Sequence, residues 1–297
     1  MSRVEITGFP VEEARRLVAT ALDEDLGPEN LDVTSTATIP VQQQGHGQVV
    51  ARAPGVLAGG PVIALVLEEL AVRTAGTSPS LEVRIADGEP LAVGDVVAVL
   101  DGPLRQVLMA ERTLLNVMSR LSGTATHTAA WTKALTGTGC TVLDTRKTTP
   151  GMRALEKYAV RCGGGTNKRM GLFDVAMVKD NHKIAAGGVG PAYRAIRSAF
   201  PKVAVEVEVT TTAEAIEALA AGARFLMCDN MSVDLLRETV AAVREWSAQH
   251  HADVEIEATG GLSLEVAAAY GATGIDWMSV GGLTHSSPIV DLALDLA

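Results

Sequence analysis

The chain has 297 residues, enough to bury a large core and to form two domains. Its net charge of −10 argues against a general nucleic-acid surface, and no apolar run reaches the roughly 18 residues that span a membrane. The amino terminus carries acidic residues and lacks the apolar stretch of a signal peptide. The three cysteines, Cys140, Cys162 and Cys228, have no metal or redox spacing. These features predict a cytoplasmic α/β protein with buried thiols.

Residues 1 to about 115 predict an N-terminal α+β, sandwich-like domain. A helix over residues 11–22 leads into a turn-rich loop over 24–40, and an apolar helix follows near 62–70. Alternating polarity predicts three strands, at 47–52, 81–85 and 96–100. We expect the C-terminal tail, residues 286–297, to join this domain.

A helical segment over residues 105–121 leads out of this domain and carries Arg112 and Arg120 among apolar residues. Beyond it, short apolar runs alternate with segments of helical periodicity. Strands are expected at 141–143, 175–178, 203–209, 225–228, 254–258 and 277–280, and helices at 152–161, 191–200, 213–221, 233–249 and 264–270. This alternation indicates parallel strands joined by crossover helices, which most often form an α/β barrel with its site at the carboxyl ends of the strands.

One segment of the second half is basic although the chain is acidic. Between Arg146 and Lys183 stand nine Lys and Arg residues against three acids, which leaves a charge of −16 for the rest of the chain. A solvated basic face would lie along a helix, whereas Arg146, Lys147 and Lys179 follow apolar strands. A guanidinium suits two-point pairing with a carboxylate, and an ammonium is a point charge for phosphate. The segment therefore predicts a site for a small, highly anionic ligand.

Carboxylates and glycine pairs end the later strands. Glu206 and Glu208 are two residues apart and so face the same side of their strand, and Asp229 ends the next one. Such acids suit a paired cation, sugar hydroxyls or a divalent ion that bridges pyrophosphate oxygens. Glycines after the last two strands would expose backbone N–H groups to a phosphate, although each pair alone also suits a tight turn. The triple glycine at 163–165 allows close approach of the backbone to a ligand or simply a helix stop.

Several segments together resemble the quinolinate phosphoribosyltransferase family. They are AERTLLN, DTRKTTPGMRALEKYAVRCGGGTN, VKDNH, VEVEV, CDN, TGGLS and VGGLTHS, in this order, with APGVLAG and the region of Asp32 earlier in the chain. The resemblance spans nearly the whole sequence. It implies an incomplete (open) α/β barrel over residues 116–285. It also implies transfer of phosphoribose from phosphoribosyl pyrophosphate to quinolinate, with decarboxylation, which yields nicotinate mononucleotide, pyrophosphate and CO2 for NAD biosynthesis.

The resemblance implies a role for each matched residue. Arg146, Arg169 and Lys179 would hold the two carboxylates of quinolinate. Arg112 would reach the same pocket from the partner subunit of a homodimer, or of a hexamer built from such dimers. Lys147, Glu208 and Asp229 would act in catalysis and bind phosphoribosyl pyrophosphate, and the two acids would also bind its Mg²⁺. The substrate-binding set is completed by Thr145, Lys168, Thr259, Gly260, Gly261, Val280, Gly281 and Gly282.

Lys168 departs from the family pattern, which commonly has histidine between Asn167 and Arg169. Lysine keeps a positive charge but lacks the titratable ring. We expect Lys168 to act as an additional carboxylate-facing cation or as a charge at the pocket rim, with quinolinate still the substrate.

Three other functions stay open on the sequence. A phosphoribosyltransferase for a related aromatic acid is the alternative that Lys168 suggests. Lys179 at a strand end could form a Schiff base in a barrel lyase, although the basic segment exceeds what a carbonyl substrate needs. A non-catalytic phosphate or nucleotide sensor would not require Arg146, Lys179, Glu208 and Asp229 together.

Overall fold

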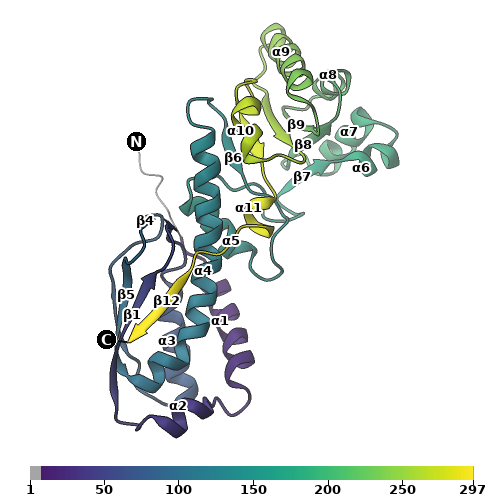
Figure 1. Ribbon diagram of the computed structural model, residues 1–297. Coiled ribbons are helices and arrows are strands. Elements are labelled where there is room, and N and C mark those ends of the chain that lie inside the picture. Colours follow the sequence, from purple (N-terminus) through teal and green to yellow (C-terminus); the bar gives the residue numbers. More distant parts are fainter. Residues whose placement is uncertain (1–7, 297) are drawn as a thin grey trace. The chain divides into compact units, whose positions relative to one another are not determined.

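The computed structural model describes residues 8–296 of the chain, which forms two compact units (Figure 1). The first unit contains the chain up to residue 129, residues 147–164 and the C-terminal part from residue 282. The second unit contains residues 130–146 and 165–281. None of the helices described between residues 8 and 296 is both long and apolar enough to span a membrane.

The first unit is built on an antiparallel sheet with the strand order β12-β1-β5-β3. The strands are β1 (Gln44–Ala51), β3 (Ser80–Val83), β5 (Val96–Pro103) and β12 (Leu292–Leu296). Two short strands, β2 (Gly55–Val56) and β4 (Pro90–Leu91), pair separately. Strand β12 comes from the C-terminal tail and pairs with β1, so that Val49 lies opposite Leu294.

Helices α1 (Val11–Leu26), α3 (Val62–Thr74) and α5 (Arg153–Cys162) contribute side chains to the hydrophobic core of this unit. The unit also contains the short helix α2 (Val33–Thr38) and the single turn α11 (Gly282–His285). Leu22, Ile63, Leu70 and Leu155 are fully buried in one hydrophobic cluster. Apolar side chains from segments far apart in the sequence thus hold the unit together.

The loop predicted over residues 24–40 is wrong in its middle, because helix α2 lies within it. Asp32 caps this helix, and its Oδ1 accepts hydrogen bonds from the backbone N–H groups of Thr34 at 2.9 Å and Ser35 at 3.1 Å. An aspartate before a short polar run is an N-cap signal, which satisfies N–H groups that a helix leaves without partners. The turn-rich composition of the stretch obscured that signal.

Helix α4 (Leu104–Ala134) is 31 residues long and continues well past the predicted end at residue 121. The close approach of α5 to it explains the first residue of the triple glycine. A Cβ at Gly163 would lie 2.3 Å from the carbonyl oxygen of Ala125 and 2.6 Å from Thr128 Cβ. Gly163 therefore permits close contact between two helices, which the sequence did not predict. It also caps the C-terminus of α5, as expected for the helix stop that the sequence left open.

The second unit contains a six-stranded parallel sheet with the order β6-β11-β10-β9-β8-β7. Its strands are β6 (Thr141–Leu143), β7 (Val175–Val178), β8 (Ala204–Val209), β9 (Phe225–Asp229), β10 (Glu255–Thr259) and β11 (Trp277–Ser279). Within residues 8–296 no strand pairing joins β7 back to β6. The predicted incomplete, open α/β barrel with a separate α+β layer is confirmed.

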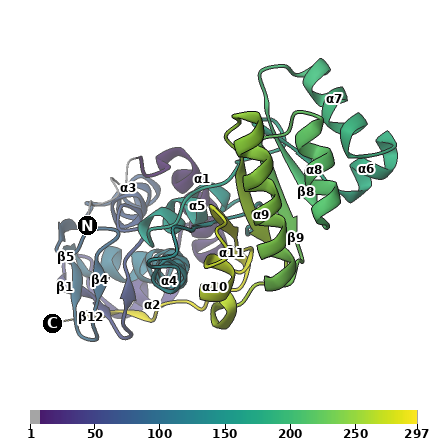
Figure 2. The ribbon, with the colours of Figure 1, turned by 90° about the horizontal axis from the view of Figure 1, so that it is seen from above.

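Crossover helices connect these strands (Figure 2). They are α6 (Asp180–Ala186), α7 (Val189–Ala199), α8 (Thr212–Ala220), α9 (Val233–His250) and α10 (Leu264–Gly271). Helix α7 packs against β7 and β8, and α8 packs against β8. The sequence did not predict α6, which begins directly after Lys179 and is only seven residues long.

Candidate active site

The polar residues of the second unit gather on one face of its sheet. Strand β8 alternates valine with glutamate, so Glu206 and Glu208 share a face that Val207 does not. Across the sheet, Glu208 lies beside Met227, and Met227 lies beside Glu257. The opposite face presents fully buried apolar residues such as Val207, Leu226 and Ile256. The apolar face anchors the sheet, which leaves the other face for chemistry.

Glu208 and Asp229 occupy the carboxyl-end half of this polar face. Glu208 Oε2 lies 3.5 Å from Lys179 Nζ, and the Lys179 side chain is half exposed whereas that of Glu208 is only 11% exposed. Asp229 stands two residues beyond Met227 on β9, and its Oδ2 accepts a hydrogen bond of 2.8 Å from Asn230 Nδ2. The structure therefore combines a cation from the end of β7 with acids from β8 and β9.

Arg169 and Arg146 interact unfavourably with each other in the same unit. Burial, followed by the positive charge of Arg146, lowers the pKa of the Arg169 guanidinium, and the nearby carboxylates of Glu206 and Asp174 partly oppose this. One guanidinium N–H of Arg169 donates to the carbonyl oxygen of Val175 at 2.8 Å. Two arginines whose charges repel each other form a place where a bound anion lowers the electrostatic energy.

Lys168 lies deeper on the polar face than the sequence suggested. Its Nζ is 2.7 and 2.6 Å from the two carboxylate oxygens of Glu257, and 3.2 Å from Glu206 Oε2. The Lys168 side chain is 7% exposed, and Glu257 is fully buried. Neither acid belongs to the site set predicted from the sequence, although Glu206 was recognised as facing the same side as Glu208.

Asp144 is a third residue that the predicted site set lacks. It is fully buried directly after β6, and it accepts hydrogen bonds from Asn167 Nδ2 at 2.6 Å and from the Lys168 backbone N–H at 2.8 Å. The carboxylate thereby fixes the stretch before Arg169 against the strand end that carries Thr145 and Arg146. Its position at the start of the DTRK segment was the available signal, because an acid among so many cations needs a structural partner.

The glycine loops differ in what their backbones do. Gly260 has φ +93°, and a Cβ there would lie 2.4 Å from Asn230 Oδ1. Thr259 lies beside Asp229 in register, and its carbonyl oxygen accepts a hydrogen bond from the Asn230 N–H. Gly261 also has a positive φ, of +56°. The backbone N–H of Val280 donates to the carbonyl oxygen of Leu143 at 3.0 Å, so this N–H group is used in a hydrogen bond to the end of β6. Gly281 is the next residue of the chain.

The remaining predicted residues belong to the first unit. Lys147 is exposed, and its carbonyl oxygen accepts a hydrogen bond of 2.8 Å from Thr284 Oγ1. Gly282 opens the turn α11 two residues before that threonine. Arg112 lies on α4 with 64% of its side chain exposed, 3.7 Å from the neighbouring Glu111.

Glu208 and Asp229 are the predicted ligands of Mg²⁺. Within the described part of the chain, no group of three or more His, Cys, Asp or Glu side chains forms a cage for a metal ion. Mg²⁺ usually keeps several waters and binds through one or two carboxylates together with phosphates of the substrate. Glu208 and Asp229, from adjacent strands on one face, fit that requirement.

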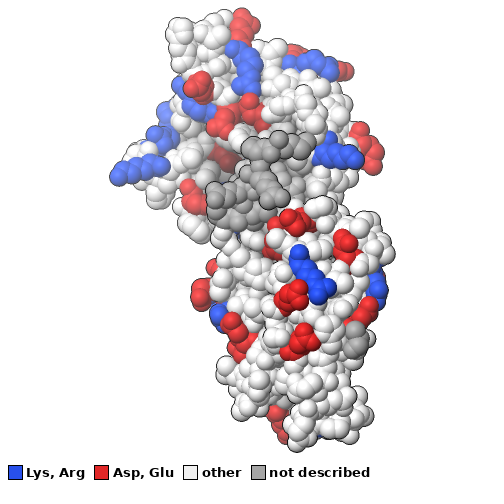
Figure 3. All heavy atoms as spheres, turned by 90° about the vertical axis from the view of Figure 1, so that its left-hand side faces the viewer, with Lys and Arg blue, Asp and Glu red and all other residues white. Residues whose placement is uncertain are grey.

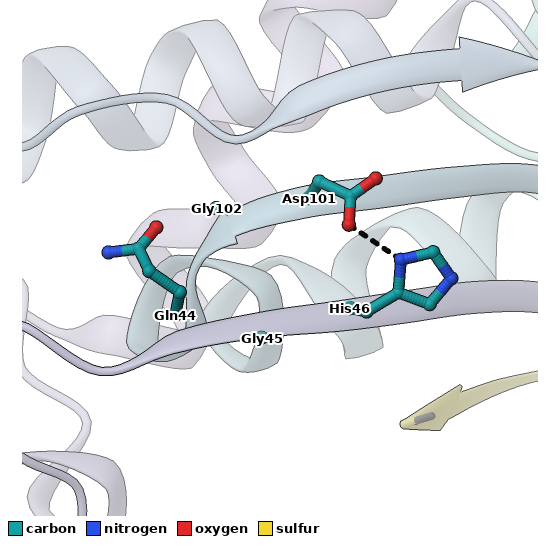
Figure 4. A pocket seen from close by; sticks show the side chains of 5 residues that line it. All are labelled: Gln44, Gly45, His46, Asp101 and Gly102. Atoms are coloured by element: carbon teal, nitrogen blue, oxygen red, sulfur yellow. Dashed lines mark hydrogen bonds and ion pairs between the residues drawn. The ribbon is translucent and has the colours of Figure 1, made fainter.

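A shallow, open hollow lies on the surface of the first unit (Figure 4). It is lined by Gln44, Gly45, His46, Asp101 and Gly102 from β1 and β5, and His46 Nδ1 lies 2.5 Å from Asp101 Oδ1. None of the predicted site residues lines it. Figure 3 shows acidic and basic side chains interspersed on one described face of the molecule, without a continuous basic surface for nucleic acid.

Comparisons with known proteins agree with this arrangement. The sequence model described as "Quinolinate phosphoribosyl transferase, N-terminal domain" matches residues 32–122, and the one for the C-terminal domain matches residues 124–295. The nicotinate-nucleotide pyrophosphorylase [carboxylating] of Mycobacterium leprae is 43% identical over 285 residues, which cover 96% of this chain and 98% of that protein.

Solved structures show the same fold. The nicotinate-nucleotide pyrophosphorylase from Francisella tularensis aligns with a TM-score of 0.88 at 32% identity, covering 98% of this chain and 99% of that one. NadC from Streptococcus pyogenes aligns with a TM-score of 0.89 at 35% identity and the same coverage. Because both family domains are matched in order and relatives are similar over nearly their whole length, this chain belongs to the quinolinate phosphoribosyltransferase family.

Proposed function

We propose that this protein transfers phosphoribose from phosphoribosyl pyrophosphate to the ring nitrogen of quinolinate, with loss of CO2, and so forms nicotinate mononucleotide for NAD biosynthesis. The observation that carries this proposal is that the second unit combines two arginines whose charges repel, Arg146 after β6 and Arg169 before β7, with acids on two strands of the sheet. These acids are Glu208 on β8 and Asp229 on β9. A dianionic acid suits the first pair, and a ribose with its pyrophosphate suits the second pair together with nearby cations.

The reaction needs positioned charge more than a nucleophile. Bond formation at the anomeric carbon creates positive charge on the ribose while pyrophosphate leaves, and the carboxylates of Glu208 and Asp229 would stabilise that charge. Lys179, 3.5 Å from Glu208, and Lys147 would stabilise the leaving pyrophosphate. Burial raises the pKa of all three thiols, Cys140, Cys162 and Cys228, to about 12, so none of them is a reactive thiolate near neutral pH.

We further propose a metal ion, a partner subunit and a cellular compartment for this reaction. Glu208 and Asp229 would hold Mg²⁺, which neutralises charge on the pyrophosphate when it is bound. Exposed Arg112 on α4 would complete the acid-binding site of a partner subunit in a homodimer. The free, buried cysteines are consistent with a reducing compartment such as the cytoplasm.

The Schiff-base alternative is supported less well by the geometry. A lysine nucleophile is activated by a hydrophobic pocket or by neighbouring cations. Lys179 is half exposed, and its Nζ lies 3.5 Å from the carboxylate of Glu208 rather than in a hydrophobic pocket. Borohydride trapping with a carbonyl substrate would leave Lys179 unmodified if this interpretation is correct.

The direct test is an assay of the purified protein with phosphoribosyl pyrophosphate, Mg²⁺ and quinolinate, in which pyrophosphate and CO2 are both measured. We expect equal amounts of the two products, and loss of activity when Mg²⁺ is chelated. Nicotinate and benzene dicarboxylates serve as competing acids. Faster turnover of any of these acids than of quinolinate would instead support a phosphoribosyltransferase for a related aromatic acid.

A further inference from the structure

Two buried acids of the open barrel share one buried cation. Lys168 Nζ makes hydrogen bonds of 2.7 and 2.6 Å to Glu257 on β10 and an ion pair of 3.2 Å to Glu206 on β8. It also lies 3.0 Å from Met227 Sδ and 5.8 Å from the centre of the Phe225 ring, both on β9 between those strands. The ammonium therefore contacts three adjacent strands on the polar face, from Glu206 on β8 to Glu257 on β10.

Glu206 is the less satisfied of the two acids. Its Oε2 is buried and has no hydrogen-bond partner within residues 8–296, although it forms the ion pair with Lys168. Burial raises the pKa of Glu206, the charge of Lys168 opposes this, and the charge of Glu257 adds to it. Arg169 is the other cation that acts on Glu206. Burial raises the pKa of the Cys140 and Cys228 thiols, and the negative charge of Glu257 adds to this.

The side chains of the adjacent residues Lys168 and Arg169 have different partners. Asp144 holds the Lys168 backbone N–H at 2.8 Å, and the Lys168 side chain reaches Glu257 and Glu206. The Arg169 guanidinium uses one N–H on the Val175 carbonyl oxygen and is influenced by Arg146. A guanidinium has five N–H donors, so most of its hydrogen-bonding capacity is not used by that single carbonyl.

We propose that Lys168 is a positioning residue, which serves as the counter-ion of Glu206 and Glu257 and thereby keeps Arg169 available for the acid substrate. Without Lys168, Glu206 would attract the Arg169 guanidinium, because a buried carboxylate recruits the nearest cation. Arg169 would then lose affinity for the dianion. This role rests on the proposed function, and it differs from the substrate-facing role that the sequence suggested for Lys168.

Substitution of the lysine together with the acid separates the two roles. Lys168→Met should raise the KM for quinolinate on the order of tenfold, because the charge-assisted contacts of Arg169 are weakened. It should leave the KM for phosphoribosyl pyrophosphate within roughly twofold. The double variant Lys168→Met/Glu206→Gln should return the KM for quinolinate to within roughly twofold of the unmodified protein. If Lys168 touches the substrate itself, the double variant stays as impaired as Lys168→Met, and the proposal is overturned.

A stability measurement tests the ion cluster independently of the reaction. Lys168→Met leaves the carboxylates of Glu206 and Glu257 buried without their counter-ion, which destabilises the folded protein. Its thermal unfolding midpoint should therefore show a deficit against the unmodified protein. The deficit should be smaller in Lys168→Met/Glu257→Gln, which removes one charge of each sign. Lys202→Met, at an exposed lysine, is the control and should match the unmodified protein.

These readouts distinguish the two proposals. If the unmodified protein does not convert quinolinate, the proposed function fails, while the unfolding measurements still test the counter-ion role. If Lys168→Met cannot be obtained folded, recovery of folded protein by the added Glu206→Gln or Glu257→Gln supports that role. Double variants no more stable than Lys168→Met would overturn it.

Discussion

The carboxylate of Glu156 is completely buried 2.9 Å from Arg120 Nη2, and this ion pair holds the loop that follows the DTRK segment. Glu156 Oε1 also accepts from Thr149 Oγ1 at 2.7 Å, and its Oε2 accepts from the Thr149 N–H at 2.9 Å. Arg120 in turn donates to the carbonyl oxygens of Thr284 and Ser287. Because Thr284 Oγ1 donates to the Lys147 carbonyl oxygen, the pair supports the backbone of a proposed catalytic residue.

Glu156→Gln should therefore lower the free energy of unfolding by about 3–5 kcal/mol, the usual effect of removing one partner of a buried ion pair. Chemical denaturation measures this directly. The matched control is Glu68→Gln, which breaks the exposed pair with Arg15 at 2.8 Å and should change stability by less than about 1 kcal/mol. Equal effects of the two substitutions would show that Glu156 is not the anchor of this loop.

Arg146→Lys should weaken quinolinate binding far more than phosphoribosyl pyrophosphate binding. A lysine keeps the charge but cannot make a planar two-point contact with a carboxylate. The lost contact is worth roughly 1.5–3 kcal/mol, which corresponds to an increase of roughly ten- to hundredfold in the KM for quinolinate. Initial rates with each substrate varied in turn measure this. Arg194→Lys, on the exposed side of α7, is the control, and equal weakening for both substrates would assign Arg146 to the phosphates.

Gly260→Ala should damage phosphoribosyl pyrophosphate binding by displacing Asn230, whose Oδ1 lies 2.4 Å from the position of the new Cβ. The substitution also strains the backbone at φ +93°. Gly94→Ala separates the backbone strain from the displacement of Asn230. Gly94 has φ +92°, but a Cβ added there would have no atom within 4 Å. Both variants should unfold at lower temperature, but only Gly260→Ala should raise the KM for phosphoribosyl pyrophosphate. An unchanged KM would remove this loop from the phosphate site.

Arg112 tests the proposed sharing of sites between subunits. Arg112→Ala and Lys147→Ala should each be inactive as pure proteins. When the two are unfolded together and refolded, mixed dimers should contain some sites with neither substitution, and part of the activity should return. Refolding each variant alone is the control. Mixed dimers that form, as shown by differently tagged subunits, but remain inactive would contradict the shared site.

The second half of the fold could be predicted from the sequence because its signals are local. Apolar runs at 141–143 and 175–178 coincide with β6 and β7, and the other four strands agree to within one residue at each end. Alternation in β8 correctly placed Glu206 and Glu208 on one face, because successive side chains of a strand point to opposite sides. The family resemblance rested on the residues at these strand ends.

Short or capped helices were harder to predict. Helix α2 begins at an aspartate cap inside a stretch rich in turn residues, and α6 is too short to show a period. The length of α4 was underestimated because its last turns are rich in Thr, Ala and Gly rather than in periodic large apolar residues. In each case neighbouring structure stabilises a helix whose own sequence signal is weak.

Only the tertiary structure determined which cation pairs with which carboxylate. The sequence showed that cations are concentrated between Arg146 and Lys183, and the strand pattern placed the acids Glu206, Glu208 and Asp229 on later strands of one sheet. Arg112 and Arg120 look alike on the same helix, yet only Arg120 pairs with a buried glutamate, 36 residues away in the chain. Lys168 is separated by 89 residues from Glu257. Ion pairing between residues so far apart depends on the distances and burial that folding creates, because charge attraction is weak in water and strengthens as the pair is buried.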